Sequence, residues 1–200
     1  MYTKYLCLSF LIFSFSLLIA QPGFAQSTIL KKGDAAPLFT AKASLAGSEF
    51  DFSLKNSLAK GPVVVYFYPS AYTGGCDAEA HAFAEQKDKF TAAGATIIGV
   101  SADDIQRLKA FSSDPQYCAG RFPVASDPGG EIAAKYGLTM GAAKVGIKDL
   151  SGQDLTHGFI PRTTFVIDKE GKIVAVFSSE TDHISPTDHV DKSLAIVKGL

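Results

Sequence analysis

The sequence predicts an α/β fold in which a mixed central sheet is flanked by helices. Residues 63–68 form a continuous run of β-branched and aromatic residues, the composition of a strand buried on both faces. From this run to the C-terminus, strand patterns alternate with helical patterns and end in a hairpin and a helix. The chain has 200 residues, of which 46% are hydrophobic and 20% charged, enough for one well-packed core.

The first 25 residues have the pattern of a secretory signal peptide. Lys4 precedes an apolar run at 5–20, and Gly23-Phe24-Ala25 places small residues where a signal peptidase cuts, before Gln26. The alternative is a retained membrane anchor, but the run is short and lies at the extreme N-terminus. We therefore expect a signal peptide at 1–25 and a single mature domain at 26–200.

This reading predicts a periplasmic or secreted protein without a membrane segment in its mature form. Of three cysteines, Cys7 would leave with the signal, so Cys76 and Cys118 remain in a compartment that permits disulfides. The net charge is −1 and no basic cluster is present, so the composition gives no reason to expect nucleic acid as a partner.

Strand and turn signals define the elements on either side of the central strand. Residues 39–43 and 49–52, separated by Leu45-Ala46-Gly47-Ser48, predict an N-terminal β-hairpin extension. Further on, the expected elements are a helix after Thr73, a strand at 95–100, a helix begun by a capping box of Ser101 and Asp104, a strand at 122–125, a helix begun by Asp127 and Pro128 and ended by Gly137, strands at 164–167 and 172–177, and a helix begun by Ser185, Pro186 and Asp188. Residues 138–158 match no element, and we expect an extended excursion there.

The central strand leads directly into a lone thiol. Pro69 ends the strand, and Thr73 stands three residues ahead of Cys76 at the start of a helical pattern that contains Phe83 and Phe90. As N-cap, the Thr73 side chain would accept a hydrogen bond from the backbone N–H of Cys76. The thiol is thus predicted in the first turn of a helix, at the carboxyl end of a buried strand, where sites of open α/β sheets gather.

These residues carry a resemblance to a known family. Pro69, Thr73 and Cys76 match the P-x-x-x-T-x-x-C motif of peroxiredoxins, and 161–168 resembles the strand that carries their active-site arginine. The similarity to this alkyl hydroperoxide reductase/thiol-specific antioxidant family, and to its Q-type or bacterioferritin comigratory protein-like subgroup, covers roughly residues 33–200. It implies a thioredoxin-like fold and a thiol peroxidase that reduces hydrogen peroxide or organic hydroperoxides.

Peroxide reduction needs a thiolate, and a helix N-terminus alone does not supply one. At a pKa near 8.5 only about 3% of a thiol is ionised at pH 7. Lowering the pKa by roughly 2.5 units takes about 3.4 kcal/mol, against ~0.3–1 kcal/mol, and at most about 2, from the helix. The resemblance implies that Arg162 supplies the missing positive charge. The alternative for Arg162 is a surface charge at the start of a strand.

The resemblance also implies roles for the neighbours of the thiol. The Thr73 hydroxyl and the Cys76 backbone N–H would stabilise the leaving oxygen together with Arg162, while Pro69 would shield the thiolate from water. Glu79, one helical turn after Cys76, would orient the arginine; a solvated helix face is the other interpretation.

Two positions depart from the family pattern. Gly74-Gly75 stand where many members have proline after the motif threonine, and His81 stands where many Q-type members have a resolving cysteine. Cys118, in a loop-like segment, is then the remaining intramolecular partner, and we expect it or an external thiol to resolve the oxidised Cys76. A buried, inert Cys118 is the alternative.

No metal or cofactor is expected. His157, His183 and His189 show no metal-ligand spacing with cysteine, and we interpret Asp182-His183 and Asp188-His189 as surface features. The expected partners are a hydroperoxide substrate and a thioredoxin-like or other thiol reductant, with the protein itself a monomer or weak homodimer.

Two other functions on the same fold require a second nearby cysteine. A thioredoxin-like disulfide oxidoreductase needs C-x-x-C, but position 79 is Glu79. A non-catalytic copper-delivery protein of this fold uses C-x-x-x-C, but position 80 is Ala80. Both alternatives are therefore weaker than the peroxidase.

Overall fold

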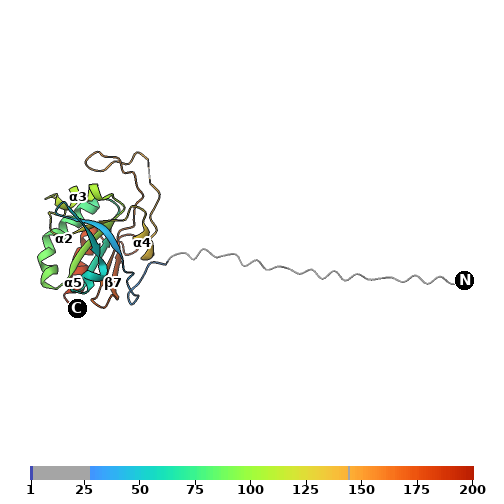
Figure 1. The fold of residues 1–200 in the computed structure, drawn as a ribbon, viewed down its shortest axis with the longest axis horizontal. Helices are drawn as coiled ribbons and strands as arrows, with labels where there is room; N and C mark the ends of the chain where they lie inside the picture. The colour runs from blue at the N-terminus through green and yellow to red at the C-terminus, as the bar shows by residue number, and fades with distance from the viewer. Residues whose placement is uncertain (2–27, 144) are drawn as a thin grey trace.

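A seven-stranded mixed sheet with helices on both faces forms the described part of the protein (Figure 1). The computed structural model describes Met1 and residues 28–143 and 145–200. Apart from Met1, the predicted signal peptide lies outside the described residues.

The sheet confirms the predicted mixed α/β class. Its spatial order is β2-β1-β5-β4-β3-β6-β7, and the central strand β3 pairs parallel with β4 and antiparallel with β6. In spatial order the strands span Ser48–Ser53, Thr40–Leu45, Val124–Ser126, Thr96–Ser101, Val63–Phe67, Thr163–Ile167 and Ile173–Ser178. The pairing of β3 with β6 brings the start of β6 beside the carboxyl end of β3, with Phe67 opposite Thr163.

Alternate residues of β3 supply the cores on the two faces of the sheet. Val63, Val65 and Phe67 pack with α1 (Leu54–Leu58) and α4 (Glu131–Lys135). Val64 and Tyr66 point to the other face, which is covered by α2, α3 and α5. These three helices span Gly74–Ala92, Ile105–Ser113 and Pro186–Val197. Because every residue of β3 is fully buried, the run reads as continuously apolar and not as alternating.

The predicted N-terminal hairpin is confirmed. Strands β1 and β2 pair antiparallel, with Leu45 opposite Ser48. The two residues between them, Ala46 and Gly47, both have positive φ, 50° and 79°. This is the backbone that a two-residue hairpin turn requires.

Two of the predicted helix starts are wrong. Ser101 belongs to β4 and donates its hydroxyl hydrogen to Asp103 (2.7 Å), so Asp104 caps α3 by accepting from the Arg107 N–H (2.8 Å). Helix α4 begins only at Glu131.

Asp127 nevertheless stabilises the start of α4 from outside the helix. Its carboxylate accepts hydrogen bonds from the N–H groups of Ile132 and Ala133, at 3.0 and 2.9 Å. The predicted start was therefore too early and the N-cap is Gly130, but the Asp127 carboxylate still binds N–H groups of the first turn. Helix α5 begins where predicted, with Ser185 as N-cap and Pro186 as its first residue, and Ser185 and Asp188 form a capping box.

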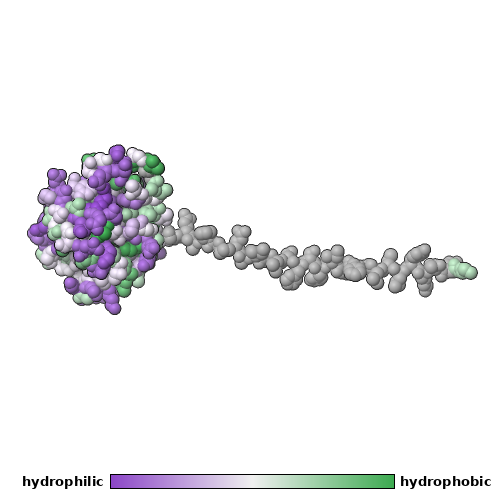
Figure 2. Space-filling view, turned by 45° about the horizontal axis from the view of Figure 1, so that its top comes forward, coloured by the Kyte–Doolittle hydropathy of each residue, from purple (hydrophilic) through white to green (hydrophobic). Residues whose placement is uncertain are grey.

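Residues 138–158 form the predicted excursion, and no helix or named strand occurs in its described part. It is drawn yellow to orange and projects beyond the helices in Figure 1. The N–H of Leu150 donates to the carbonyl of Tyr72 at 2.9 Å, which ties the excursion to the loop after β3. The side chains of Val145 and Leu150 are exposed, although most of the face seen in Figure 2 is hydrophilic or mixed. Among the described helices, none has the length and apolar character needed to cross a membrane.

Candidate active site

Cys76 lies in the first turn of α2 and is 2% exposed. Thr73 is the N-cap residue, as predicted, but its side chain does not cap the helix. The N–H groups of Cys76 and Asp77 donate to the backbone carbonyl of Thr73, at 2.8 and 2.9 Å. The Thr73 hydroxyl donates to the carbonyl of Ser70 at 2.8 Å. The predicted cap bond to Cys76 is therefore wrong, because the hydroxyl is engaged by the loop.

Arg162 reaches the thiol from the adjoining strand. It immediately precedes β6, and its Nη2 lies 3.1 Å from Cys76 Sγ. The Arg162 side chain is only 10% exposed, so the interpretation as a surface charge does not hold. The long sequence separation between the two residues is closed by the antiparallel pairing of β3 with β6.

Glu79 is the second partner of this guanidinium. Its Oε2 pairs with Arg162 Nη1, and the side chain is completely buried, so the interpretation as a solvated helix face is wrong. Its other oxygen, Oε1, has no hydrogen-bond partner among the described residues. His189 Nδ1 lies 4.0 Å from that oxygen.

His189 was predicted at the surface, and this is wrong. It is fully buried and hydrogen-bonds with Thr164 Oγ1 and Ser179 Oγ, each at 2.9 Å. The residue lies on the inward face of α5, one position before the buried Val190. By contrast, His183 is exposed, as predicted.

Opposing influences act on the ionisation of Cys76. Burial raises the pKa of the thiol and is the largest influence, whereas Arg162, the backbone of Ser70 and the Thr73 side chain lower it. The net direction is upward, against the lowered pKa that the chemistry requires, because the sulfur is almost sealed from water. The Arg162 contact is thus the main element that favours the thiolate in this closed site.

The carboxyl and imidazole behind Arg162 are also perturbed. Burial raises the pKa of Glu79 to about 8, although the charge of Arg162 and its hydrogen bond oppose this. Burial, together with the charge of Arg162, lowers the pKa of His189 to about 4. His189 is therefore neutral in the physiological range.

The loop between β3 and α2 has an unusual backbone. Pro69 opens it and is half-buried. Tyr72 has a positive φ of 58°, and the Arg107 guanidinium lies over its ring at 5.0 Å from the centroid. The Tyr72 ring also meets Tyr117 edge-to-face, with centroids 5.4 Å apart. A strained residue of this kind persists only when its surroundings hold it in place.

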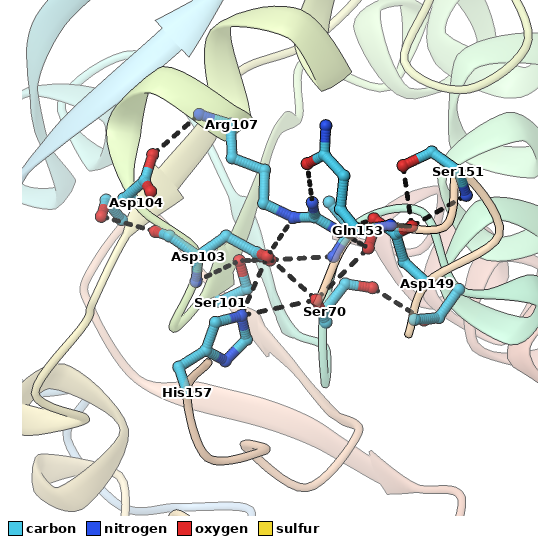
Figure 3. A network of polar contacts seen from close by, with 12 residues as sticks. Ser70, Ser101, Asp103, Asp104, Arg107, Asp149, Ser151, Gln153 and His157 are labelled. Carbon is cyan, nitrogen blue, oxygen red and sulfur yellow. Dashed lines mark hydrogen bonds and ion pairs between the residues drawn. The ribbon is translucent and has the colours of Figure 1, made fainter. Parts of the chain in front are cut away.

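A buried carboxylate that the sequence did not single out holds the same loop. Asp103 Oδ1 accepts a hydrogen bond from Ser70 Oγ (2.9 Å), and Oδ2 accepts from the Ala71 N–H (2.8 Å) and Ser101 Oγ (2.7 Å) (Figure 3). Arg107 Nε and His157 Nε2 lie 2.8 and 3.0 Å from Oδ1. We call Asp103, Arg107 and His157 the clamp.

The clamp joins the excursion to the active-site loop. Arg107 Nη2 donates to the carbonyl of Ala71 (2.8 Å) and to Asp149 (2.6 Å), while Nη1 donates to Gln153 (3.1 Å). Figure 3 shows Asp103, which follows β4, converging with Arg107 of α3 and with Asp149, Gln153 and His157 of the excursion. The residues after Pro69, which carry the backbone toward Thr73 and Cys76, are thereby fixed from one side.

Cys118 lies in a turn after α3 and, like Cys76, is an unbonded, buried thiol. Both belong to the apolar cluster on the face covered by α2, α3 and α5. Burial, followed by the charges of Asp77 and Asp114, raises the pKa of Cys118 well above its ordinary value. Within the described residues, no group of three or more His, Cys, Asp or Glu side chains is arranged to hold a metal ion.

Comparisons with known proteins agree with this geometry. Residues 32–176 match the AhpC/TSA family. The chain is 32% identical to chloroplastic peroxiredoxin Q of Populus jackii over 191 residues, which cover 94% of this chain and 78% of that protein. Peroxidoxin BcpB of Mycobacterium tuberculosis superposes with a TM-score of 0.69 at 32% identity, covering 86% of this chain and 98% of that one. The bacterioferritin comigratory protein of Xanthomonas campestris superposes at 0.64 and 25% identity, with the same coverage.

Proposed function

Since the chain belongs to the AhpC/TSA family and is therefore a thiol-dependent peroxidase, we propose that Cys76 is its peroxidatic residue. The observation that carries this assignment is the 3.1 Å contact between Arg162 Nη2 and Cys76 Sγ at the buried start of α2. A guanidinium stays protonated, so it favours the thiolate over the thiol. The structure of the X. campestris relative concerns its alkyl peroxide reduction activity, which supports organic hydroperoxides beside hydrogen peroxide as substrates.

In the reaction, the Cys76 thiolate attacks one oxygen of the hydroperoxide. An S–O bond forms, the O–O bond breaks, and the leaving alkoxide or hydroxide takes up a proton, which leaves Cys76 as a sulfenic acid. Arg162 is the donor best placed to stabilise the developing negative charge. In the resting site, the Cys76 N–H and the Thr73 hydroxyl are already bonded to the loop, so their part requires that they exchange these partners.

The test of this assignment is peroxide consumption by the Cys76→Ser protein. We expect loss of turnover with hydrogen peroxide and with an organic hydroperoxide, while the Cys118→Ser protein still reduces the first equivalent. A Cys76→Ser protein that retained most of its turnover would overturn the assignment.

We propose further that Cys118 resolves the sulfenic acid, with an external thiol such as a thioredoxin-like protein restoring the dithiol. Cys118 shares an apolar cluster with Cys76, and the position used in many Q-type members is the exposed His81. Peptide mass mapping after one equivalent of peroxide, under non-reducing conditions, should detect a Cys76–Cys118 disulfide. A free Cys118 thiol beside an oxidised Cys76 would mean a one-cysteine enzyme.

Export to the periplasm or the exterior is a proposal from the sequence, as is a monomeric or weakly dimeric state. The basis for the proposed export is Lys4, the apolar run at 5–20 and Gly23-Phe24-Ala25. Mass spectrometry of the protein from its native envelope should find a start at or near Gln26. An intact N-terminus in the membrane fraction would instead indicate an anchor.

A further inference from the structure

Asp77, the residue after Cys76, is a buried carboxylate that the peroxidatic site does not use. It is 7% exposed, and neither carboxylate oxygen has a hydrogen-bond partner among the described residues. Burial of a carboxylate without partners costs free energy, and such groups are rare outside functional sites. The other buried carboxylates near the site, Glu79 and Asp103, are each held by an arginine.

The face of α2 that carries Asp77 packs against the segment that carries Cys118. His81 follows Asp77 by one helical turn, and its Nδ1 lies 3.1 Å from the carbonyl oxygen of Gln116. Asp88, three turns after Asp77, pairs with Arg121 at 2.7 Å. Residues at i, i+4 and i+11 share one face of an α-helix. Gln116 and Arg121 stand on either side of Cys118 in the sequence. Asp77 therefore lies on the face of α2 that packs against the turn containing Cys118.

We propose that Asp77 is the base that takes the proton from the Cys118 thiol when Cys118 attacks the oxidised Cys76. The inference rests on the proposed function, in which Cys118 resolves the sulfenic acid. It deepens that function by naming a residue for the second chemical step.

The step balances without a further reactant. The Asp77 carboxylate accepts the proton from Cys118 Sγ, and the resulting thiolate attacks Cys76 Sγ, so that an S–S bond forms and the S–O bond breaks. The departing hydroxide takes the proton back from Asp77 and leaves as water. Because Asp77 is joined to Cys76 by one peptide bond, it stays close to the sulfenic acid in any rearrangement that brings the two sulfurs together.

The need for a base follows from the burial of Cys118. Its raised pKa leaves few thiolates at neutral pH, and only the thiolate attacks. Burial also raises the pKa of Asp77, to about 6. The carboxyl group is therefore mostly ionised at pH 7, yet basic enough to accept a proton.

Several other groups act on Asp77 and bear on its pH dependence. The backbone N–H groups of Tyr72 and Thr73 lie near the carboxylate without hydrogen-bonding geometry and lower its pKa, as does Arg107 from α3. Asp114, which follows α3, raises it. Burial raises the pKa values of Tyr117 and Cys118 in the turn, and the negative charge of Asp77 raises both further.

The experiment measures the two steps separately on the purified protein. After one equivalent of hydrogen peroxide, samples are quenched at intervals, and sulfenic acid and disulfide at Cys76 are quantified by mass. In the wild type, the rate of disulfide formation should rise with pH through about 6, as Asp77 ionises, and then level off. In Asp77→Asn, the ratio of disulfide formation to sulfenic acid formation should fall, by roughly 10²-fold. Its pH dependence should then follow only the ionisation of Cys118, rising steadily beyond pH 8.

Two variants separate the base from a structural role. Asp77→Glu keeps a carboxylate and should keep the rise near pH 6, whereas Asp88→Asn removes the same charge from the same helix face and should behave as the wild type. The proposal is overturned if Asp77→Asn forms the disulfide at the wild-type rate, or if it is slower but keeps the wild-type pH profile. A wild-type protein that never forms the disulfide overturns the resolving role of Cys118, and with it this step, while peroxide reduction at Cys76 stands.

Discussion

Arg162 Nη2 lies 3.1 Å from Cys76 Sγ, and the other terminal nitrogen of the same guanidinium pairs with the buried carboxylate of Glu79. One planar group therefore joins a thiol and a carboxylate in a site nearly closed to water. The arrangement has opposite effects on the thiol. The positive charge lowers the pKa of Cys76, while the negative charge of Glu79 raises it. Glu79 thus fixes the guanidinium at the cost of part of its electrostatic effect.

Replacement of Arg162 by Met should raise the pKa of Cys76 further and slow its reaction with peroxide. Loss of one preorganised donor to a developing oxyanion typically costs about 10²–10³-fold. The measurements are the rate of reaction with hydrogen peroxide and the pH dependence of alkylation. Arg162→Lys keeps a charge without the planar fork and should recover only part of the rate. Unchanged alkylation in Arg162→Met would show that burial alone controls the thiol.

Replacement of Glu79 by Gln should separate the two effects of this carboxylate. Cys76 ionises above the pKa of Glu79, about 8, where that carboxylate is charged. Removal of the charge therefore lowers the pKa of Cys76, and alkylation should move to lower pH. The guanidinium also loses its charged anchor, and the reaction with hydrogen peroxide should slow even though more thiolate is present. A faster peroxide reaction in Glu79→Gln would mean that Arg162 needs no anchor.

The central strand, the helix after it and the order of the elements could be predicted because their signals are local. Val63 to Phe67 is apolar on both faces, and Ser185 with Asp188 caps α5 through contacts three residues apart. The five-residue helix α1 was missed because it is too short to show a period. The predicted Thr73 cap is wrong because a threonine hydroxyl can hydrogen-bond either to the helix N–H groups or to a carbonyl of the loop. The sequence does not show that the carbonyl of Ser70 lies within reach.

The clamp could not be predicted, because its members meet only in the folded chain. Asp103 and Arg107 follow β4, whereas His157 comes from an excursion without any periodic pattern. His189 was misplaced for a related reason. The polar neighbours of His189 along the chain suggest a surface position. The residue instead lies on the inward face of α5, where it hydrogen-bonds with Thr164. Because Ser193, one turn later on the same face of α5, is also polar, the sequence contains no local sign that His189 is buried.

The clamp should make stability depend on pH through His157. Asp103 raises the pKa of His157 in the folded state, mainly by a hydrogen bond. A group whose pKa is raised on folding stabilises below its unfolded value, about 6.5, and this contribution is lost as the pH rises through the folded value. Thermal unfolding of the wild type and His157→Gln should therefore differ most near pH 5 and least in alkaline solution. His183→Asn, at an exposed position, should track the wild type.

Asp103 itself should contribute in the complementary window. Burial raises its pKa, but hydrogen bonds from His157, the Ala71 N–H and Ser101 outweigh this, so the net pKa is lowered. Its contribution is present above its unfolded pKa, about 3.9, and is lost as the pH falls through the lower folded value. Asp103→Asn leaves Arg107 and His157 without their buried partner and should cost about 3–5 kcal/mol of unfolding free energy at neutral pH. A loss below about 1 kcal/mol would show that Asp149 alone can hold Arg107.

The two glycines before Cys76 should differ sharply when each is replaced by alanine. A Cβ at Gly75 would lie 3.2 Å from Arg162 Nη2 and 3.4 Å from Pro186 Cγ, whereas a Cβ at Gly74 would meet no atom within 4 Å. Both positions are helical, so alanine should stabilise α2 at either, by up to about 1 kcal/mol. At position 75 the guanidinium must shift by a few tenths of an ångström, which disturbs its contact with the Cys76 sulfur. We expect Gly75→Ala to react with hydrogen peroxide several-fold to about tenfold more slowly, with alkylation of Cys76 moved to higher pH. Gly74→Ala is the matched control and should keep the wild-type rate. Equal rates in both variants would mean that the position of Arg162 tolerates such a shift without loss of catalysis.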